Sequence, residues 1–146
     1  MSGFLLDTNC VSELVRIQPD PRVMEWMEAT DEGMLYLSVL TLGEIRKGLA
    51  CLAQGRRRTH LETWLEVELQ ARFSGRILPI DAPAADRWGQ LAAHAKSRGT
   101  PLPIIDGLLA ATALHYNLTV VTRNAGDFTN AQVQVLNPWK AGARRQ

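Results

Sequence analysis

The chain has 146 residues and a mass of 16.2 kDa, which suits one domain with a core of its own. Hydrophobic residues make up 46% of it and charged residues 21%, so the composition excludes a disordered or fibrous protein. Lys and Arg number 16 and Asp and Glu 15, and the formal net charge of +1 excludes a broad positive field as the means of attracting nucleic acid.

Short apolar runs alternate with longer helical patterns along the chain. The expected strands cover residues 3–6, 34–37, 76–80, 118–122 and 133–136, and the expected long helices cover residues 39–52, 60–73, 84–97 and 104–116. This alternation predicts an α/β fold, a three-layer α/β/α sandwich with a mostly parallel sheet of about five strands. We expect residues 1–140 to form a single domain and residues 141–146 a basic, flexible tail.

Turn and cap signals agree with these boundaries. Asp81 and Pro83 supply an N-cap and an early proline for the helix over 84–97, and Gly99 follows its end. Pro103 precedes the next helix, and Asn117 closes it. The helical segments are therefore bounded on both sides by residues that favour helix ends.

The location of the protein is predicted from what the sequence lacks. It has no apolar stretch of about 18 residues, and its N-terminus lacks the basic start and long apolar core of a secretory signal. Cys10 and Cys51 lie far apart without a metal-binding spacing, which predicts free thiols rather than a disulfide or a zinc site. We expect a cytoplasmic protein that does not enter a membrane.

Two carboxylates follow expected strands, where ligands bind in open α/β sheets. Asp7 comes directly after the first strand, with Thr8 and Asn9 behind it. Its alternative role is to cap a helix that begins near Val11. Asp127 follows the strand over 118–122 through a short loop, and its alternative role is that of a turn residue.

Two further carboxylates lie on the apolar faces of expected helices. Asp106 shares a face with Leu109 and Ala113, and an unpaired buried carboxylate would cost several kcal/mol, so a cation is its natural partner. The alternative is an exposed aspartate in a first helical turn, which the helix dipole favours. Glu44 lies on a stripe of apolar and small residues, and its alternative is a surface glutamate paired with Lys47.

Four acids that converge on one crevice would form an all-oxygen site. Such a ligand set favours Mg²⁺ or Mn²⁺ over zinc or copper. A pair of these ions about 3.5–4 Å apart is a common device for phosphodiester hydrolysis. A phosphorylatable receiver domain also places carboxylates and Mg²⁺ at strand ends, but it expects two adjacent acids after the first strand and a lysine after the last. The chain offers neither.

Four segments resemble the successive motifs of PIN-domain nucleases, and more narrowly the VapC/FitB-type toxins of bacterial type II toxin–antitoxin systems. These segments are residues 5–9, 42–48, 105–113 and 121–128. The resemblance runs nearly end to end and implies a parallel sheet and a metal-dependent endoribonuclease that uses Mg²⁺ or Mn²⁺. It also implies a homodimer, inhibition by a cognate antitoxin and a toxin–antitoxin hetero-oligomer.

The resemblance also implies roles for individual residues. Asp7 and Asp106 would be the principal metal ligands, and Glu44 would complete the acidic core. Asp127 would be a fourth catalytic acid that ligates a second ion, holds a water or lies outside the site, because Asn124 stands where some relatives have Asp. The residues expected to orient carboxylates and water are Asn9, Thr122 and Asn124.

Basic residues near the acidic motifs are candidates for contacts with RNA. Arg46 and Lys47 could guide an RNA backbone toward the site, and the alternative for the basic groups of the chain is a solvated loop and a disordered end. Two other functions remain open on the sequence alone. One is a PIN-fold binding module without catalytic activity, and the other is a housekeeping PIN nuclease without an antitoxin.

Overall fold

The computed structural model describes residues 3–140, which build one five-stranded sheet with the strand order β3-β2-β1-β4-β5. All neighbouring strands run parallel. The strands are β1 (Phe4–Leu6), β2 (Leu35–Ser38), β3 (Ile77–Leu78), β4 (Thr119–Val121) and β5 (Val135–Leu136). The predicted α/β class, the parallel sheet and its five strands are confirmed. Strand β2 has the predicted length, shifted by one residue, and the other four strands are shorter than predicted.

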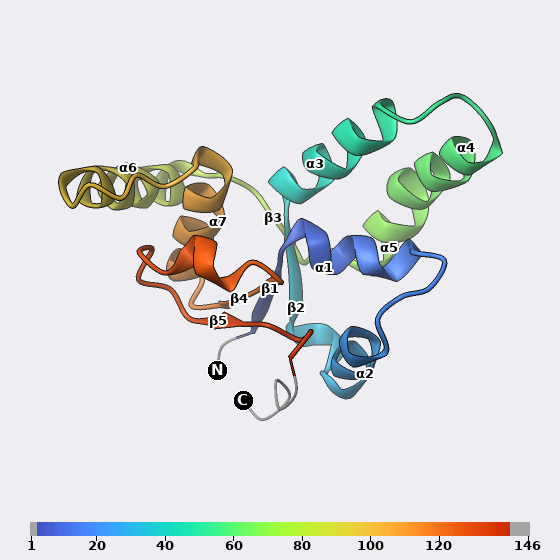
Figure 1. Cartoon of the computed structure of the whole chain (residues 1–146), viewed down its shortest axis with the longest axis horizontal. Helices are drawn as coiled ribbons and strands as arrows, with labels where there is room; N and C mark the ends of the chain where they lie inside the picture. Colours follow the sequence, from blue (N-terminus) through green and yellow to red (C-terminus); the bar gives the residue numbers. More distant parts are fainter. Residues whose placement is uncertain (1–2, 141–146) are drawn as a thin grey trace.

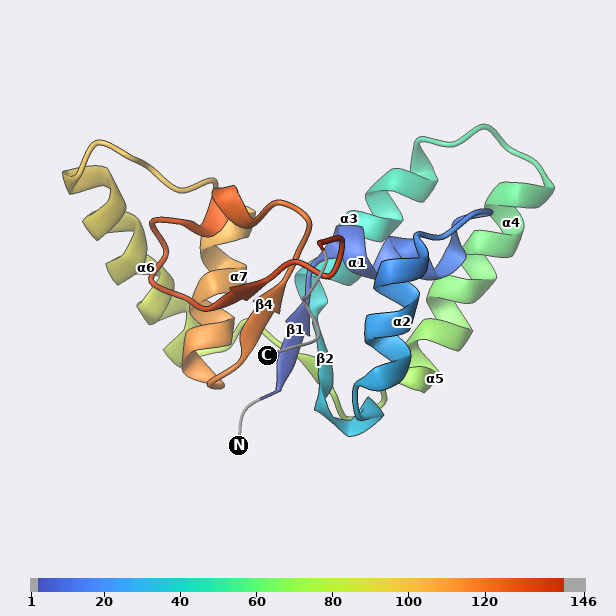
Figure 2. The ribbon, with the colours of Figure 1, turned by 60° about the horizontal axis from the view of Figure 1, so that its bottom comes forward.

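Helices cover both faces of the sheet, as Figures 1 and 2 show. The helices on one side are α1 (Thr8–Ser12), α2 (Pro21–Ala29), α3 (Val39–Ala50), α4 (Arg56–Thr63) and α5 (Gln70–Arg72). The long pair α6 (Ala82–Ser97) and α7 (Ile104–His115) lies on the other side. The shorter turns of helix are η1 (Glu13–Val15), η2 (Glu32–Met34), the π-helical η3 (Trp64–Leu69) between α4 and α5, and η4 (Ala125–Phe128). The three-layer arrangement is confirmed.

The strands are apolar along their length because both faces of the sheet are buried. Leu5 and Leu6 are each fully buried, but Leu5 packs in the cluster with α6 and α7 while Leu6 packs in the cluster with the first five helices. Val120 and Val121 divide between the two clusters in the same way. Continuous apolar runs of this kind are typical of parallel strands covered on both sides.

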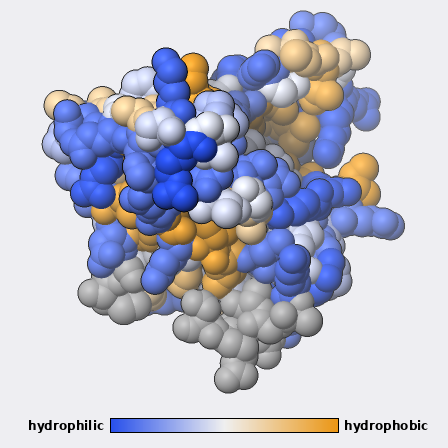
Figure 3. Space-filling model, turned by 60° about the vertical axis from the view of Figure 1, so that its left-hand side comes forward, coloured by the Kyte–Doolittle hydropathy of each residue, from blue (hydrophilic) through white to orange (hydrophobic). Residues whose placement is uncertain are grey.

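The two faces of the sheet are packed with side chains of different size. Trp26, Trp64 and Phe73 are buried under the first five helices. Small residues of α7, such as Ala110 and Ala113, fill much of the other side. There a Cβ added to Gly107 would lie 3.0 Å from ring atoms of Trp88, so α6 and α7 approach closely at this glycine. The outward face on the α6 side is mostly hydrophilic (Figure 3).

Helix boundaries differ from the predicted ones at three places. Helix α2 was missed, although Asp20 accepts a hydrogen bond from the N–H of Arg22 and Pro21 opens the helix, the same signal that located α6. The helix expected near Val11 begins at Thr8, because Asp7 is its cap. The helix expected over 60–73 begins four residues earlier, at Arg56.

Three further predictions concern the C-terminal tail, the two cysteines and the membrane. The tail expected over 141–146 lies outside the described residues. Within the described ones, both cysteines are free thiols, with Cys10 buried and Cys51 exposed, and none of the helices is long and apolar enough to cross a bilayer. Burial raises the pKa of Cys10 to about 12, so this thiol stays protonated near neutral pH.

Candidate active site

Asp7 lies where β1 meets α1, and its carboxylate is held from two directions. Its Oδ1 accepts the N–H of Thr8 at 2.7 Å, which caps α1, and its Oδ2 accepts the hydroxyl of Thr122 at 2.8 Å. Its own N–H still donates to the carbonyl of Val121 at 2.9 Å. The two roles predicted for Asp7, cap and site residue, are therefore compatible, because each uses a different carboxylate oxygen.

Thr122 directly follows β4 and connects that strand end to Asp7. Its Oγ1 donates to Asp7 and accepts from the side-chain amide of Asn9 at 3.2 Å and from the N–H of Asn124 at 3.0 Å. Asn9 in turn accepts the N–H of Arg123 at 3.3 Å. Thr122 thus contacts Asp7 directly and Asn9 contacts Thr122, and their role in orienting a carboxylate and water stays a prediction. Asn124 takes part through its backbone.

Glu44 reaches the site from α3, which starts where β2 ends. Ser38 caps this helix by accepting the N–H of Leu40 at 3.0 Å. The half-buried Glu44 carboxylate accepts a hydrogen bond from the hydroxyl of Thr8, the residue next to Asp7. The alternative pairing with Lys47 is absent from the ion pairs of the described residues.

Asp106 occupies the first turn of α7 and is half-buried. Burial raises the pKa of its carboxyl to about 6, and the negative charges of Asp7, Asp127 and Glu44 add to this shift. Burial is also the largest cause that raises the pKa of Asp7, although hydrogen bonds from Thr122 and Thr8 act against it. Glu44 and Asp127 raise the pKa of Asp7 further. The four acids therefore share one electrostatic field.

Asp127 contributes to this field from a different kind of position. It lies on η4 after β4 and is exposed to solvent. Its N–H donates to the carbonyl of Asn124 at 3.0 Å, as in a turn. Asp127 therefore has the backbone hydrogen bond of a turn residue, and its charge acts on Asp7 and Asp106. Its part in catalysis and metal binding stays a prediction.

The donor set can be tested against a divalent cation. In the part of the chain that the structure describes, no Lys or Arg forms an ion pair with any of the four acids, although two of these carboxyls have raised pKa values. No group of three or more His, Cys, Asp or Glu side chains in residues 3–140 is arranged to hold an ion by itself. Mg²⁺ usually keeps several waters and takes one or two carboxylates directly. The arrangement fits such a water-rich site.

The predicted RNA contacts lie in different settings. The Arg46 guanidinium is 2.6 Å from Glu66 and 3.7 Å from Glu62, so acidic side chains of the neighbouring helical segments already engage it. Lys47 is exposed on α3. Their contact with RNA stays a prediction, which this structure favours for Lys47 more than for Arg46.

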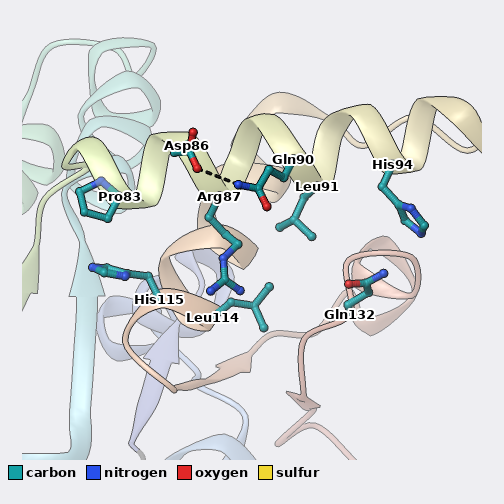
Figure 4. Close-up of a pocket in the computed structure, with 9 residues that line it drawn as sticks. All are labelled: Pro83, Asp86, Arg87, Gln90, Leu91, His94, Leu114, His115 and Gln132. Carbon is teal, nitrogen blue, oxygen red and sulfur yellow. Dashed lines mark hydrogen bonds between the residues drawn. The ribbon is translucent and has the colours of Figure 1, made fainter.

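Two cavities differ in their relation to the acids. One, of about 410 Å³, is lined by Thr8, Glu44, Gly48 and Trp64 among others, and therefore adjoins the site. The other, of about 580 Å³, lies between α6, α7 and Gln132 (Figure 4). None of the four acids lines this second cavity, so its size does not mark it as the reaction site.

Sequence reasoning did not single out two polar residues that the structure sets apart. Glu13 is only 2% exposed, and it accepts the N–H of Asp20 at 2.6 Å, which holds the segment that leads into α2. In the sequence, the signal that could have indicated this role is an acid placed between the apolar residues Val11 and Leu14. Arg123 lies directly after Thr122, and a basic residue at a strand's carboxyl end was likewise visible.

The chain matches the family model of the PIN domain over residues 4–133. It is 43% identical to the toxin FitB of Neisseria gonorrhoeae over 135 residues, which span 92% of this chain and 97% of that protein. It is 40% identical to the VapC ribonuclease Y4jK of Sinorhizobium fredii over 136 residues, or 93% and 97% of the two chains.

Solved structures agree with these matches. The crystal structure of FitAcB from Neisseria gonorrhoeae superposes with a TM-score of 0.88 at 43% identity, over 93% of this chain and 98% of that one. A toxin–antitoxin complex from Klebsiella pneumoniae superposes with a TM-score of 0.70 at 25% identity, over 93% and 98% of the two chains. This chain therefore belongs to the PIN domain family, among the proteins that resemble FitB and VapC.

Proposed function

We propose that this chain is a metal-dependent endoribonuclease that acts as the toxin of a toxin–antitoxin pair. One observation carries the proposal: four carboxylates from β1, α3, α7 and η4 share one electrostatic field, and no basic side chain in the described residues pairs with any of them. Such a site is suited to cations rather than to an anionic substrate alone. The names of the relatives support RNA as the substrate.

The residues of the site would have different roles in hydrolysis. Asp7 and Asp106 would hold Mg²⁺ or Mn²⁺, with Glu44 completing the acidic core. An ion held by these residues would lower the pKa of an attacking water and stabilise the leaving oxygen. Thr122 keeps one oxygen of Asp7 in place, and Thr8 does the same for Glu44. Asp127, which is exposed, would hold a water or a second ion at the edge of the site.

The proposed partners follow from the relatives. The complex from Klebsiella pneumoniae is a toxin–antitoxin complex, and the relative from Neisseria gonorrhoeae is a toxin. We propose a cognate antitoxin for this chain, a homodimer, and assembly of the two proteins into a hetero-oligomer in the cytoplasm. Co-expression with any small protein that a neighbouring gene encodes, followed by size-exclusion chromatography with light scattering, tests both assemblies.

The nuclease activity is tested by RNA cleavage in Mg²⁺, in Mn²⁺ and in EDTA. We expect cleavage by the wild type with either ion, none in EDTA, and a loss of more than about 100-fold in Asp106→Asn, because second-shell changes alone already cost 10–100-fold. Asp86→Asn is the matched control, since Asp86 is an exposed helical aspartate that accepts a hydrogen bond from Gln90.

The outcomes separate the alternatives. Equal cleavage by the wild type and Asp106→Asn in EDTA would refute the mechanism. Absence of cleavage in a well-folded protein that still binds a partner would favour the binding module. Cleavage without any antitoxin partner would favour a housekeeping nuclease.

A further inference from the structure

Arg123 occupies a prominent place beside the carboxylate site. It follows Thr122, whose hydroxyl holds Asp7, at the carboxyl end of β4. Its guanidinium carbon lies 4.7 Å from the centre of the Trp139 ring, which is within the range of a cation–π contact. Arg123 is exposed while Trp139 is only 7% exposed, so the guanidinium covers the ring.

The backbone around this stack is held by two asparagines. Asn9 accepts the N–H of Arg123 at 3.3 Å, and the side-chain amide of Asn137 donates to the carbonyl of Arg123 at 3.2 Å. The side-chain oxygen of Asn137 also accepts the N–H of Trp139 at 2.9 Å. Asn137 therefore links both partners of the stack. None of these hydrogen bonds uses the arginine side chain, so the backbone path does not depend on it.

The charge of Arg123 is not used to neutralise the acids of the site. Among the described residues, its guanidinium forms no ion pair, and the charges that act on Asp7 and Asp106 are those of other carboxylates. Arg123 instead makes a small contribution to the low pKa of Asp20, for which Arg22 is the main cause. The guanidinium thus lies to one side of the carboxylates.

An arginine stacked on an aromatic ring is well suited to bind a phosphate. Stacking on an aromatic ring orients the flat guanidinium while leaving its edge N–H groups available, and this fork matches the oxygens of a phosphate. Because Trp139 is covered, its ring cannot take a base. Because the Arg123 guanidinium lies to one side of the carboxylates, it would meet a phosphate that neighbours the one being cleaved. Phosphate contacts of this kind set the register of a nucleic acid on a protein.

We propose that Arg123, stacked on Trp139, forms a subsite for the RNA phosphate next to the scissile one. This inference rests on the proposed ribonuclease function. The subsite positions the substrate without depending on its base sequence, and it adds binding energy in both the ground state and the transition state. Its loss should therefore raise KM and leave kcat nearly unchanged.

The test combines binding with kinetics. Binding of a short fluorescein-labelled single-stranded RNA to Asp106→Asn is measured by anisotropy over a range of salt concentrations, with and without Arg123→Ala. We expect about 10-fold weaker binding and a salt slope that is smaller by about 0.7, the value for one phosphate contact on a single strand. In the wild-type background, Arg123→Ala should raise KM about 10-fold.

Three further variants serve as controls. Arg87→Ala removes the same charge from an exposed arginine at the second cavity (Figure 4) and should change neither the slope nor KM. Arg123→Met keeps an apolar stem over Trp139 and should behave as Arg123→Ala does. Arg123→Lys keeps the charge without the fork and should recover only part of the affinity. Thermal unfolding monitors the fold of each variant.

The results distinguish a failure of the phosphate subsite from a failure of the proposed ribonuclease function. Equal effects of Arg123→Ala and Arg87→Ala on the slope and on KM would overturn the subsite, as would full recovery of affinity by Arg123→Lys. If the wild type fails to cleave RNA, the ribonuclease proposal fails, but the binding measurements still show whether Arg123 contacts a phosphate.

Discussion

Asp7 and Asp106 are the two carboxylates expected to share one cation, and their surroundings are opposite. Asp7 is almost fully buried and accepts hydrogen bonds from Thr8 and Thr122. Asp106 is half-buried, has no hydrogen bond to its carboxylate among the described residues, and has a pKa raised to about 6. In the proposed metal site, the strand end would therefore supply a carboxylate that hydrogen bonds already hold in place. The helix start would supply a carboxylate whose negative charge burial disfavours until a cation binds.

Different parts of the fold also determine the positions of Asp7 and Asp106. Asp7 is placed by the sheet, since its N–H bonds to the carbonyl of Val121. Asp106 is placed by α7, and the next residue, Gly107, sets how closely α7 approaches Trp88 on α6. The position of Asp7 therefore depends on strand pairing and hydrogen bonds, and that of Asp106 on helix packing.

Among changes that leave the four acids in place, the largest effect is expected when the hydrogen bond from Thr122 to Asp7 is removed. Thr122→Val keeps the shape of the buried side chain but loses the hydroxyl that donates to Asp7, so kcat/KM for RNA should fall about 10- to 100-fold. Thr122→Ser keeps the hydroxyl and should retain most of the activity. Thr112→Val is the control, because buried Thr112 donates only to its own helix, at Leu108. Equal activity of the two valine variants would contradict the difference between the acids.

A smaller effect is expected from the helix contact behind Asp106. Gly107→Ala adds a Cβ 3.0 Å from Trp88 ring atoms, and this overpacking should lower the free energy of unfolding by about 1–3 kcal/mol. Gly89→Ala in α6 adds a Cβ in open space and should raise it by about 0.5–1 kcal/mol. Urea unfolding of both variants checks the pair. A stabilising Gly107→Ala would show that the contact does not limit the approach of the helices.

The smallest effect is expected from pH. The pKa of Asp106 rises from 3.8 to about 6 on folding, so the folded protein binds the proton more tightly than the unfolded chain does. The stability from this group is therefore fully present below about pH 4 and is lost as pH rises through about 6. Without metal, Asp106→Asn should melt above the wild type at pH 7 and lose this advantage at pH 4.

The control for pH is Asp86→Asn, a change at an exposed helical aspartate outside the site. Addition of Mg²⁺ should stabilise the wild type more than Asp106→Asn at pH 7, because a ligand that binds only the folded state raises its stability. A pH-independent difference between wild type and Asp106→Asn would contradict the raised pKa.

Much of the fold could be predicted because local signals agreed with the tertiary structure. The apolar runs around Leu5 and Val120 lie in strands, and the cap signal at Asp81 lies at the start of α6. Helix α2 has the same cap signal at Asp20 but is absent from the predicted helices. Its apolar pattern is short and consists of Val23, Trp26 and Met27. Exact strand ends depend on pairing with neighbours, which periodicity does not contain.

The site could be predicted only in part. Each acid was visible as a carboxylate in apolar surroundings or after a strand, and all four contribute to one field. The sequence did not indicate that Arg46 is engaged by Glu66, or that Arg123 lies on Trp139, because these partners are 20 and 16 residues apart in the chain and meet only in the fold.

The sequence by itself determined the alternation of strands and helices, the acids available to a site and the family, since periodicity, caps and motifs are local properties of the chain. The tertiary structure decided which oxygen of Asp7 meets Thr122, how far the pKa of Asp106 rises and that Arg123 lies over the ring of Trp139. Those features depend on distances between distant segments and on burial. Both quantities come into being only when the two layers of helices close over the sheet.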